Sequence, residues 1–295
     1  MPKPSRLTLA KQNIVLAFQR APQQVYSKSQ LEDVLTKNRA TWELARRTST
    51  DEFVEFLTNQ RIARSQTFVS DRYGRQIVRY SFGRASPYAL ALSIQAKAYL
   101  CYATALNLHG LANVNPKLLY LNSEQSPKPD PSGALAQDRI DNAFKKAQRL
   151  SNLIYGLGDL SFTIVSGKHT KGLGVEEIRH SDSETLAVTN LERTLVDIAV
   201  RPAYAGGISL VLKAYRAAKV RVSVDRLLKI LKDLDYRYPY HQSIGFLMQK
   251  VGYPQHSYAK LRALGLHHDF YLDYNMQQPA YSPDWRLYHP AELSE

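Results

Sequence analysis

One stretch decides the fold of the N-terminal part, residues 49–82, which read STDEFVEFLTNQRIARSQTFVSDRYGRQIVRYSF. Ser49 and Glu52 have the spacing of a capping box, and three apolar residues follow at the spacing of one helix face. From residue 62 to residue 82 the sequence alternates like a β-hairpin, and Gly74 in the turn suits a left-handed backbone position. The stretch therefore predicts a capped helix followed by a hairpin.

Two further helices are expected before this stretch. Residues 8–20 show an apolar periodicity that ends at Ala21-Pro22, where proline stops a helix. Ser27 or Ser29 can cap a second helix. Three helices followed by a hairpin are the order of a winged helix-turn-helix, in which the third helix enters the major groove of DNA. We therefore expect residues 1–86 to form a winged helix-turn-helix DNA-binding domain.

The positive charge of the chain is concentrated in the same part. The 295 residues carry a formal net charge of +13. Residues 1–95 contain 15 Lys and Arg and 7 Asp and Glu, a net charge of +8, so +5 is left for the other 200 residues. A concentrated basic field favours a polyanionic partner, most commonly nucleic acid. Charge alone does not distinguish a surface that binds nucleic acid from the alternative, a basic surface that only keeps the chain soluble.

The hairpin supplies four candidate contacts to DNA, although each could instead be a solvated strand charge: Arg64, Arg72, Arg75 and Arg79. On the return strand Arg75 and Arg79 are predicted to lie on the face opposite Val78. The outer face of the third helix carries Asp51, Glu52 and Glu55. These carboxylates would repel phosphate, but they can accept a hydrogen bond from N4 of cytosine. We therefore place base reading on the loop and helix start formed by Arg46, Arg47, Thr48, Ser49 and Thr50.

The remaining residues, 87–295, are predicted to form a larger α/β domain. Ser86-Pro87 is typical of a helix start, so residues 88–97 are expected to be a connecting helix. Strands are expected at 99–102, 118–122, 160–165, 175–179 and 185–188, with a helix at 103–108. From residue 190 the chain is expected to be mainly helical, until short strands at 270–274 and 285–288. The predicted fold class is thus α/β (mixed α+β).

The sharpest pattern of this domain is VTNLERTLVDIAVRP, residues 188–202. Thr189 and Glu192 are expected to form a capping box where a strand passes into a helix. Arg193 or Asp197 would then belong to an ion pair. The alternative makes Glu192, Arg193 and Asp197 a polar functional site. The pattern favours the structural interpretation, because a capping box already accounts for one of the three charges.

Three segments together resemble the AbiEi-type antitoxins of type IV toxin–antitoxin systems, a family also described as predicted transcriptional regulators. They are residues 99–111 (YLCYATALNLHGL), 119–125 (LYLNSEQ), and 188–202 with the following Gly206-Gly207. In the resemblance, the motif residues of the antitoxin domain are His109, Glu192, Arg193 and Asp197. After about Lys219 the chain matches only in its helical character.

The resemblance implies a protein with two activities. The N-terminal domain would bind inverted repeats of double-stranded DNA in its own promoter and repress the operon. The C-terminal domain would counteract a co-encoded nucleotidyltransferase-type toxin, without requiring a stable complex. The resemblance implies no catalytic residue, and we expect no cofactor and no metal.

The residues give little support to a disulfide-linked, secreted or membrane-spanning protein. Cys101 is the single cysteine, so an internal disulfide is excluded, and its apolar neighbours predict a buried side chain. His109 is expected at a helix end, where its ring can meet the helix dipole. Neither a secretory signal nor an apolar run of membrane length is visible, which predicts a soluble, cytoplasmic protein.

Two alternatives stay open. The first is a metal-dependent nuclease with a winged-helix targeting domain, for which Asp159, Glu176 and Glu177 could supply carboxylates. The second is a DNA-binding adaptor in phage defence that has no toxin partner.

Overall fold

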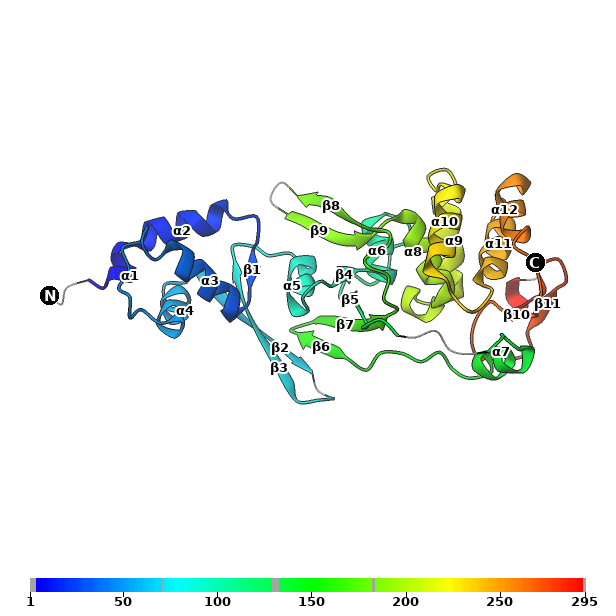
Figure 1. Cartoon of the computed structure of the whole chain (residues 1–295), viewed down its shortest axis with the longest axis horizontal. Coiled ribbons are helices and arrows are strands. Elements are labelled where there is room, and N and C mark those ends of the chain that lie inside the picture. The colour runs from blue at the N-terminus through cyan, green and yellow to red at the C-terminus, as the bar shows by residue number, and fades with distance from the viewer. Residues whose placement is uncertain (1–3, 71, 129–132, 182–183, 294–295) are drawn as a thin grey trace. The chain divides into compact units, whose positions relative to one another are not determined.

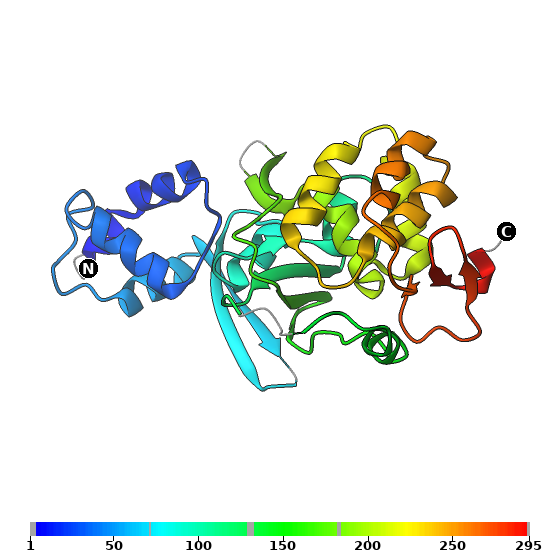
Figure 2. The same cartoon turned by 45° about the vertical axis from the view of Figure 1, so that its right-hand side comes forward.

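The computed structural model describes residues 4–70, 72–128, 133–181 and 184–293 (Figures 1 and 2). The fold is mixed α/β, as predicted. The chain divides into two compact units. Unit 1 comprises residues 1–98, 152–163 and 177–186, and unit 2 comprises residues 99–151, 164–176 and 187–295. This division differs from the predicted boundary at 86/87, because the helix after residue 86 and two later segments belong to unit 1.

Unit 1 begins with four helices, drawn in blue in Figure 1: α1 (Arg6–Leu9), α2 (Lys11–Arg20), α3 (Lys28–Asn38) and α4 (Thr50–Asn59). Ser27 caps α3 in a capping box with Gln30. Ser49 caps α4 in a capping box with Glu52, which confirms the predicted start of this helix. Apolar side chains from these helices form one core that includes the fully buried Phe53. The position of α4 is therefore fixed both by its cap and by its apolar face.

The hairpin of unit 1 is part of a larger sheet. Its strands are β2 (Ala63–Ser70) and β3 (Arg75–Phe82), and β1 (Val25–Tyr26) pairs antiparallel with β3. On the other side, β2 pairs with β6 (Ile154–Leu157), which pairs with the first half of β7 (Leu160–Gly167). Helix α5 (Pro87–Ile94) is capped by Ser86, as predicted. The sequence did not predict β6, which covers one edge of the hairpin.

The strand register assigns the hairpin side chains to two faces. Residues opposite each other in an antiparallel pair share a face. By this rule Arg75 and Arg79 lie on the same face of the hairpin as Phe68. Val78 lies on the other face, as predicted. Phe68 is fully buried and contacts Phe162, with 5.2 Å between ring centroids. The arginine-bearing face is therefore partly covered, because its middle contributes to the core of unit 1.

Unit 2 is built around short strands. β4 (Tyr99–Leu100) pairs antiparallel with β5 (Leu118–Glu124) and parallel with β9 (Glu184–Thr189). β7 lies beside β5, and β8 (Val175–Ser181) lies beside β9. The division between the units falls within β7, β8 and β9. Helices α6 (Tyr102–Leu108) and α8 (Leu191–Val200) pack against each other, and α7 (Gln137–Phe144) precedes β6 in the chain.

The C-terminal part of unit 2 is mainly helical, as predicted. Its elements are η1 (Pro202–Ala205), α9 (Ile208–Ala218), α10 (Val224–Leu234), α11 (Tyr240–Lys250), α12 (Gln255–Arg262), β10 (Phe270–Tyr271), β11 (Ala280–Ser282), β12 (Leu287–His289) and η2 (Ala291–Leu293). Gly245 of α11 faces the buried Trp285 so closely that a Cβ atom would lie 2.1 Å from the indole ring. Within the described residues, every helix is too short or too polar to cross a membrane.

Candidate functional site

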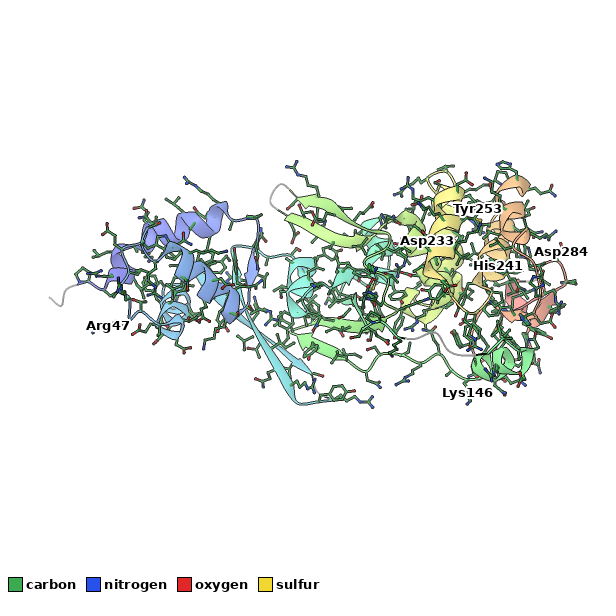
Figure 3. The ribbon with its side chains drawn as sticks, in the orientation of Figure 1. Arg47, Lys146, Asp233, His241, Tyr253 and Asp284 are labelled. Carbon is green, nitrogen blue, oxygen red and sulfur yellow. The ribbon has the colours of Figure 1, made fainter. Side chains whose placement is uncertain are left out.

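A residue that the sequence analysis did not single out holds the loop before α4. Arg39 donates from Nη1 to the carbonyl of Ala45 (2.7 Å) and from Nη2 to the carbonyl of Thr48 (3.1 Å). Because these carbonyls are tied to one guanidinium, the loop backbone is fixed. The side chains of Arg46 and Arg47 are exposed, and Figure 3 shows Arg47 at the surface of unit 1. The loop thus presents two cations from an ordered backbone.

The acidic side chains at the start of α4 are engaged in local contacts. Asp51 forms an ion pair with Lys28, at the start of α3, with 2.5 Å between Oδ1 and Nζ. Glu52 accepts the backbone N–H of Ser49 at 2.9 Å as part of the capping box. Both contacts reduce the repulsion that these carboxylates would exert on phosphate. Of the three acidic residues on this face, Glu55 is the one outside both contacts.

Three of the four hairpin arginines are exposed, namely Arg64, Arg72 and Arg75. The guanidinium carbons of Arg72 and Arg75 lie 5.8 and 5.9 Å from the ring centroid of Tyr73. The ring is itself 49% exposed. The hairpin tip therefore displays an aromatic ring with two cations close to it, a grouping that suits a polyanionic surface.

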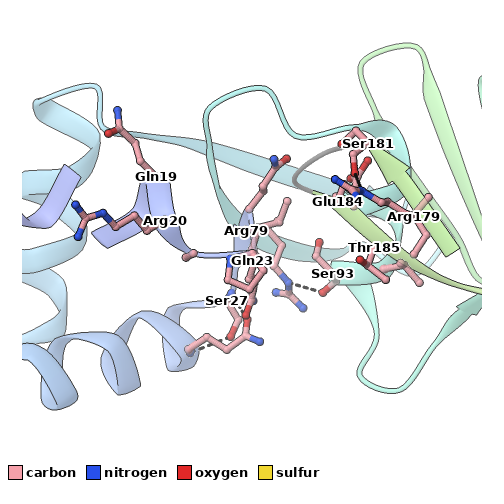
Figure 4. Close-up of a pocket in the computed structure, with 18 of the residues that line it drawn as sticks. Gln19, Arg20, Gln23, Ser27, Arg79, Ser93, Arg179, Ser181, Glu184 and Thr185 are labelled. Carbon is pink, nitrogen blue, oxygen red and sulfur yellow. Dashed lines mark hydrogen bonds between the residues drawn. The ribbon is translucent and has the colours of Figure 1, made fainter. Parts of the chain in front are cut away.

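Arg79 occupies a different setting from the other hairpin arginines. Its Nε donates to the carbonyl of Ser93 at 2.7 Å (Figure 4). Its Nη2 donates to the carbonyl of Ile94 at 3.1 Å. These are terminal carbonyls of α5, which lack partners within the helix, so Arg79 caps α5. Partial burial lowers the pKa of Arg79 by desolvation. Arg79 also lines a pocket of about 930 Å³ in unit 1. The α5 contacts account for Arg79 without any contact to DNA.

In unit 2 the three segments that carry the family resemblance meet. Leu100 of β4 pairs with Leu121 of β5 on one side and with Val188 of β9 on the other. His109 stands at the C-terminal end of α6, as predicted, and its Nε2 lies 2.7 Å from the carbonyl oxygen of Thr189. The segments are therefore neighbouring parts of one structure.

Arg193 and Asp197 form a buried ion pair on α8. The Nε of Arg193 lies 2.7 Å from Oδ1 of Asp197, and the two side chains are 4% and 5% exposed. Nη1 of Arg193 also donates to the carbonyl of Leu173 at 2.6 Å. Burial raises the pKa of Asp197, while the guanidinium of Arg193 opposes that rise. The contacts give both charges a structural role.

The predicted capping box of Thr189 and Glu192 is wrong. Asn190 caps α8 instead, by accepting the backbone N–H of Arg193 at 2.8 Å. Asparagine is at least as good a cap as threonine and stands one residue closer to the helix. Glu192 accepts the backbone N–H of Ser223, the residue that caps α10, at 2.9 Å. Glu192 thus connects α8 to α10, which the local spacing did not reveal.

A second carboxylate without a sequence signal organises the loop between β7 and β8. Glu124, at the end of β5, accepts the backbone N–H groups of Thr170 (2.9 Å), Lys171 (2.9 Å) and Gly172 (3.1 Å). At Gly174, where φ is +68°, a Cβ atom would lie 2.8 Å from the Cβ of Arg193. Glycine therefore lets this loop reach the buried ion pair of α8.

The chain shares its fold with the RV2827C protein from Mycobacterium tuberculosis. That crystal structure matches with a TM-score of 0.56 and 18% sequence identity, over 97% of this chain and 93% of that chain. The likeness concerns the fold alone at this identity. No family model matches the chain, and no curated protein matches it. The resemblance to AbiEi-type antitoxins therefore stays a prediction.

The carboxylates considered for a nuclease gain no support from the geometry. In the part of the chain that the structure describes, no group of three or more His, Cys, Asp or Glu side chains could hold a metal ion. Glu176 and Glu177 are consecutive on β8, so their side chains leave the strand on opposite faces. Cys101 is fully buried, and burial raises the pKa of its thiol, so it is a poor nucleophile.

Proposed function

We propose that the protein is a DNA-binding transcriptional regulator that contacts duplex DNA through unit 1. The observation that carries this proposal is the ordered loop before α4, which exposes Arg46 and Arg47 beside a helix N-terminus. Helix N-termini carry partial positive charge and free backbone N–H groups, both of which attract phosphate. Helix α4 corresponds to the third helix predicted from the sequence. In a winged helix-turn-helix the N-terminal end of that helix faces the major groove.

The proposed interface has two parts with separate tasks. Arg46 and Arg47, with the neighbouring Thr48, Ser49 and Thr50, would contact base edges and the nearest phosphates. Arg72 and Arg75 would contact phosphate or the minor groove from the hairpin tip, with Arg64 further along β2. Phosphate contacts set the affinity and its salt dependence, while contacts to base edges set the specificity.

Gel-shift titrations with the DNA upstream of the native gene test this interface. The variants are Arg46→Ala/Arg47→Ala and Arg72→Ala/Arg75→Ala. The matched control is Lys213→Ala/Arg216→Ala, which removes two exposed cations from α9 of unit 2. We expect both unit 1 variants to bind more weakly. Arg72→Ala/Arg75→Ala should also make the slope of log K against log salt less steep by about two, since each phosphate contact contributes about one. Equal losses in all three variants would mean that binding depends on net charge alone.

The second half of the proposal follows the family resemblance. We propose that the regulator binds inverted repeats in its own promoter, and that unit 2 counteracts a co-encoded nucleotidyltransferase-type toxin. Its support is the resemblance of residues 99–111, 119–125 and 188–202. Co-expression of the full chain with the adjacent toxin gene should restore growth. The Arg46→Ala/Arg47→Ala variant should restore it as well, because its substitutions lie in unit 1. Absence of rescue by the native chain contradicts the antitoxin assignment without affecting the DNA-binding one.

A further inference from the structure

A cluster of hydrogen-bond donors lies at the end of α8 in unit 2. Arg201 follows the helix, and its guanidinium carbon lies 5.9 Å from the ring centroid of Tyr204. The hydroxyl groups of three other tyrosines also lie within electrostatic range of Arg201: Tyr102, Tyr236 and Tyr274. Together with Gln148, described below, these residues are called the Arg201 cluster.

Among the described residues, the guanidinium of Arg201 has no hydrogen-bond acceptor of its own. It forms no ion pair and no hydrogen bond with any residue that the structure describes, although it is partly buried. One carboxylate within its electrostatic range is Asp197, which is already bonded to Arg193 at 2.7 Å. Among the described residues, the positive charge of Arg201 therefore has no counter-ion of its own. Partial burial weakens the hydration of such a charge, so a bound anion would stabilise it.

A second donor of the cluster also lacks an acceptor. Oε1 of Gln148 accepts the backbone N–H of Ala203 at 3.2 Å, which places this amide against the turn that follows Arg201. Nε2 of the same side chain is fully buried and has no partner within the described residues. Buried polar atoms in native proteins nearly always have partners, so an orphaned donor requires an explanation. A ligand that brings acceptor atoms is one such explanation.

The tyrosines add donors and a strained backbone. Tyr102 has a φ of +50°, a left-handed conformation that a bulky side chain rarely adopts. Its ring lies 5.0 Å from that of Tyr204, and burial raises the pKa of its phenol, so the hydroxyl keeps its proton. The hydroxyl oxygen of Tyr204 accepts the backbone N–H of Ser151 at 2.7 Å, which leaves its own proton to donate. Backbone strain of this kind gathers at functional sites.

We propose that the Arg201 cluster binds a phosphate-type anion, as free phosphate or as the phosphate group of a nucleotide. The cluster combines a guanidinium, an amide N–H and phenolic O–H groups, and Asp197, a carboxylate within electrostatic range of Arg201, is already paired with Arg193. A tetrahedral oxyanion accepts several such donors at once, and guanidinium geometry suits it well. This site lies in unit 2 and does not depend on the proposed DNA contacts.

Thermal unfolding and isothermal titration of the full chain test this site. The probes are inorganic phosphate, ATP and GTP, compared with chloride at equal ionic strength. We expect phosphate to raise the unfolding midpoint of the native chain. Arg201→Gln and Gln148→Leu should each lower the affinity, Arg201→Gln about tenfold or more, since it removes charged hydrogen bonds. Binding of a nucleotide at least tenfold tighter than phosphate would identify the nucleotide as the source of the anion.

Two controls separate this site from other basic surfaces. Arg216→Ala removes an exposed arginine of α9, and Arg46→Ala/Arg47→Ala removes the cations before α4. Both variants should keep the phosphate-induced shift. The proposal is overturned if no probe shifts the native midpoint beyond the chloride control. It is also overturned if Arg201→Gln and Gln148→Leu, measured as ligand-induced shifts from their own midpoints, respond as the native chain does.

Discussion

Replacement of Arg193 by methionine should destabilise the protein strongly. The substitution would leave Asp197, which is 5% exposed, without the guanidinium that lies 2.7 Å away. It would also remove the donor to the carbonyl of Leu173. Breaking a buried ion pair on one side costs about 3–5 kcal/mol. Urea unfolding followed by circular dichroism would measure this loss as a lower midpoint at unchanged slope.

The pH dependence of this loss has a definite sign. Burial already raises the pKa of Asp197, and Arg193→Met removes the charge that opposes this rise. The folded variant would then hold the proton more tightly than its unfolded chain does. The loss is therefore complete only above the folded pKa of Asp197 in the variant, and it becomes smaller as the pH falls from there towards the unfolded pKa of about 4. Unfolding curves of the native chain and the variant at several pH values would show the two midpoints converging.

Two further variants decide whether the pair acts as argued. Arg193→Met/Asp197→Leu removes both charges, and such replacements are often neutral or stabilising, so most of the lost stability should return. Lys260→Met breaks an exposed ion pair with Asp225 and should cost no more than about 1 kcal/mol. If Arg193→Met unfolds at the native midpoint, or if the double variant is as unstable as the single one, the structural role of the pair is refuted.

Two other predictions concern the caps and the loop carboxylate. Ser49→Ala should lower the free energy of unfolding by about 1 kcal/mol. It should also weaken DNA binding in gel shifts, because the cap orders the start of α4. The control Ser223→Ala removes the cap of α10, and it should lower stability without affecting DNA binding. Burial alone would raise the pKa of Glu124, but hydrogen bonds from the Thr170 hydroxyl and from the backbone N–H groups of Thr170 and Gly172 lower it below its usual value. The contribution of Glu124 to stability is therefore present above the unfolded pKa and is lost as the pH falls through the folded one. Glu124→Gln should therefore destabilise by about 1–3 kcal/mol at neutral pH and by less in acid, as measured by thermal unfolding. A pH-independent loss would contradict the role given to the Glu124 charge.

The elements that the sequence predicted well carry their signals locally. The capping box of Ser49 and Glu52, the proline after Ser86 and the alternation in β2 and β3 each lie within one short stretch. Cues of this kind depend on neighbours along the chain, which the sequence contains in full.

The missed features depend on partners that are distant in the chain. Glu124 meets its donors 46 to 48 residues later, and Glu192 meets Ser223 31 residues later. Arg79 donates hydrogen bonds to carbonyl groups of α5, 14 and 15 residues later in the chain. Its position in the strand predicted only a side chain on the outer face of the hairpin. No local pattern distinguishes these side chains from solvated charges. Their roles became visible once the tertiary contacts were known.

The most direct test of whether unit 1 contacts the duplex uses an iron chelate that is attached to the protein and cuts DNA close to it. Cys101 is the only cysteine and is fully buried, so a cysteine introduced at the surface can be labelled alone. The label would be placed on Gln76→Cys, beside the hairpin tip, and on Ser209→Cys of α9 as the control, both of which replace exposed, uncharged side chains. Hydroxyl radicals from the chelate should cut the upstream DNA at discrete positions from Gln76→Cys and leave it uncut from Ser209→Cys. Intact DNA with Gln76→Cys, under conditions where the labelled protein shifts the same fragment, would contradict the proposed interface.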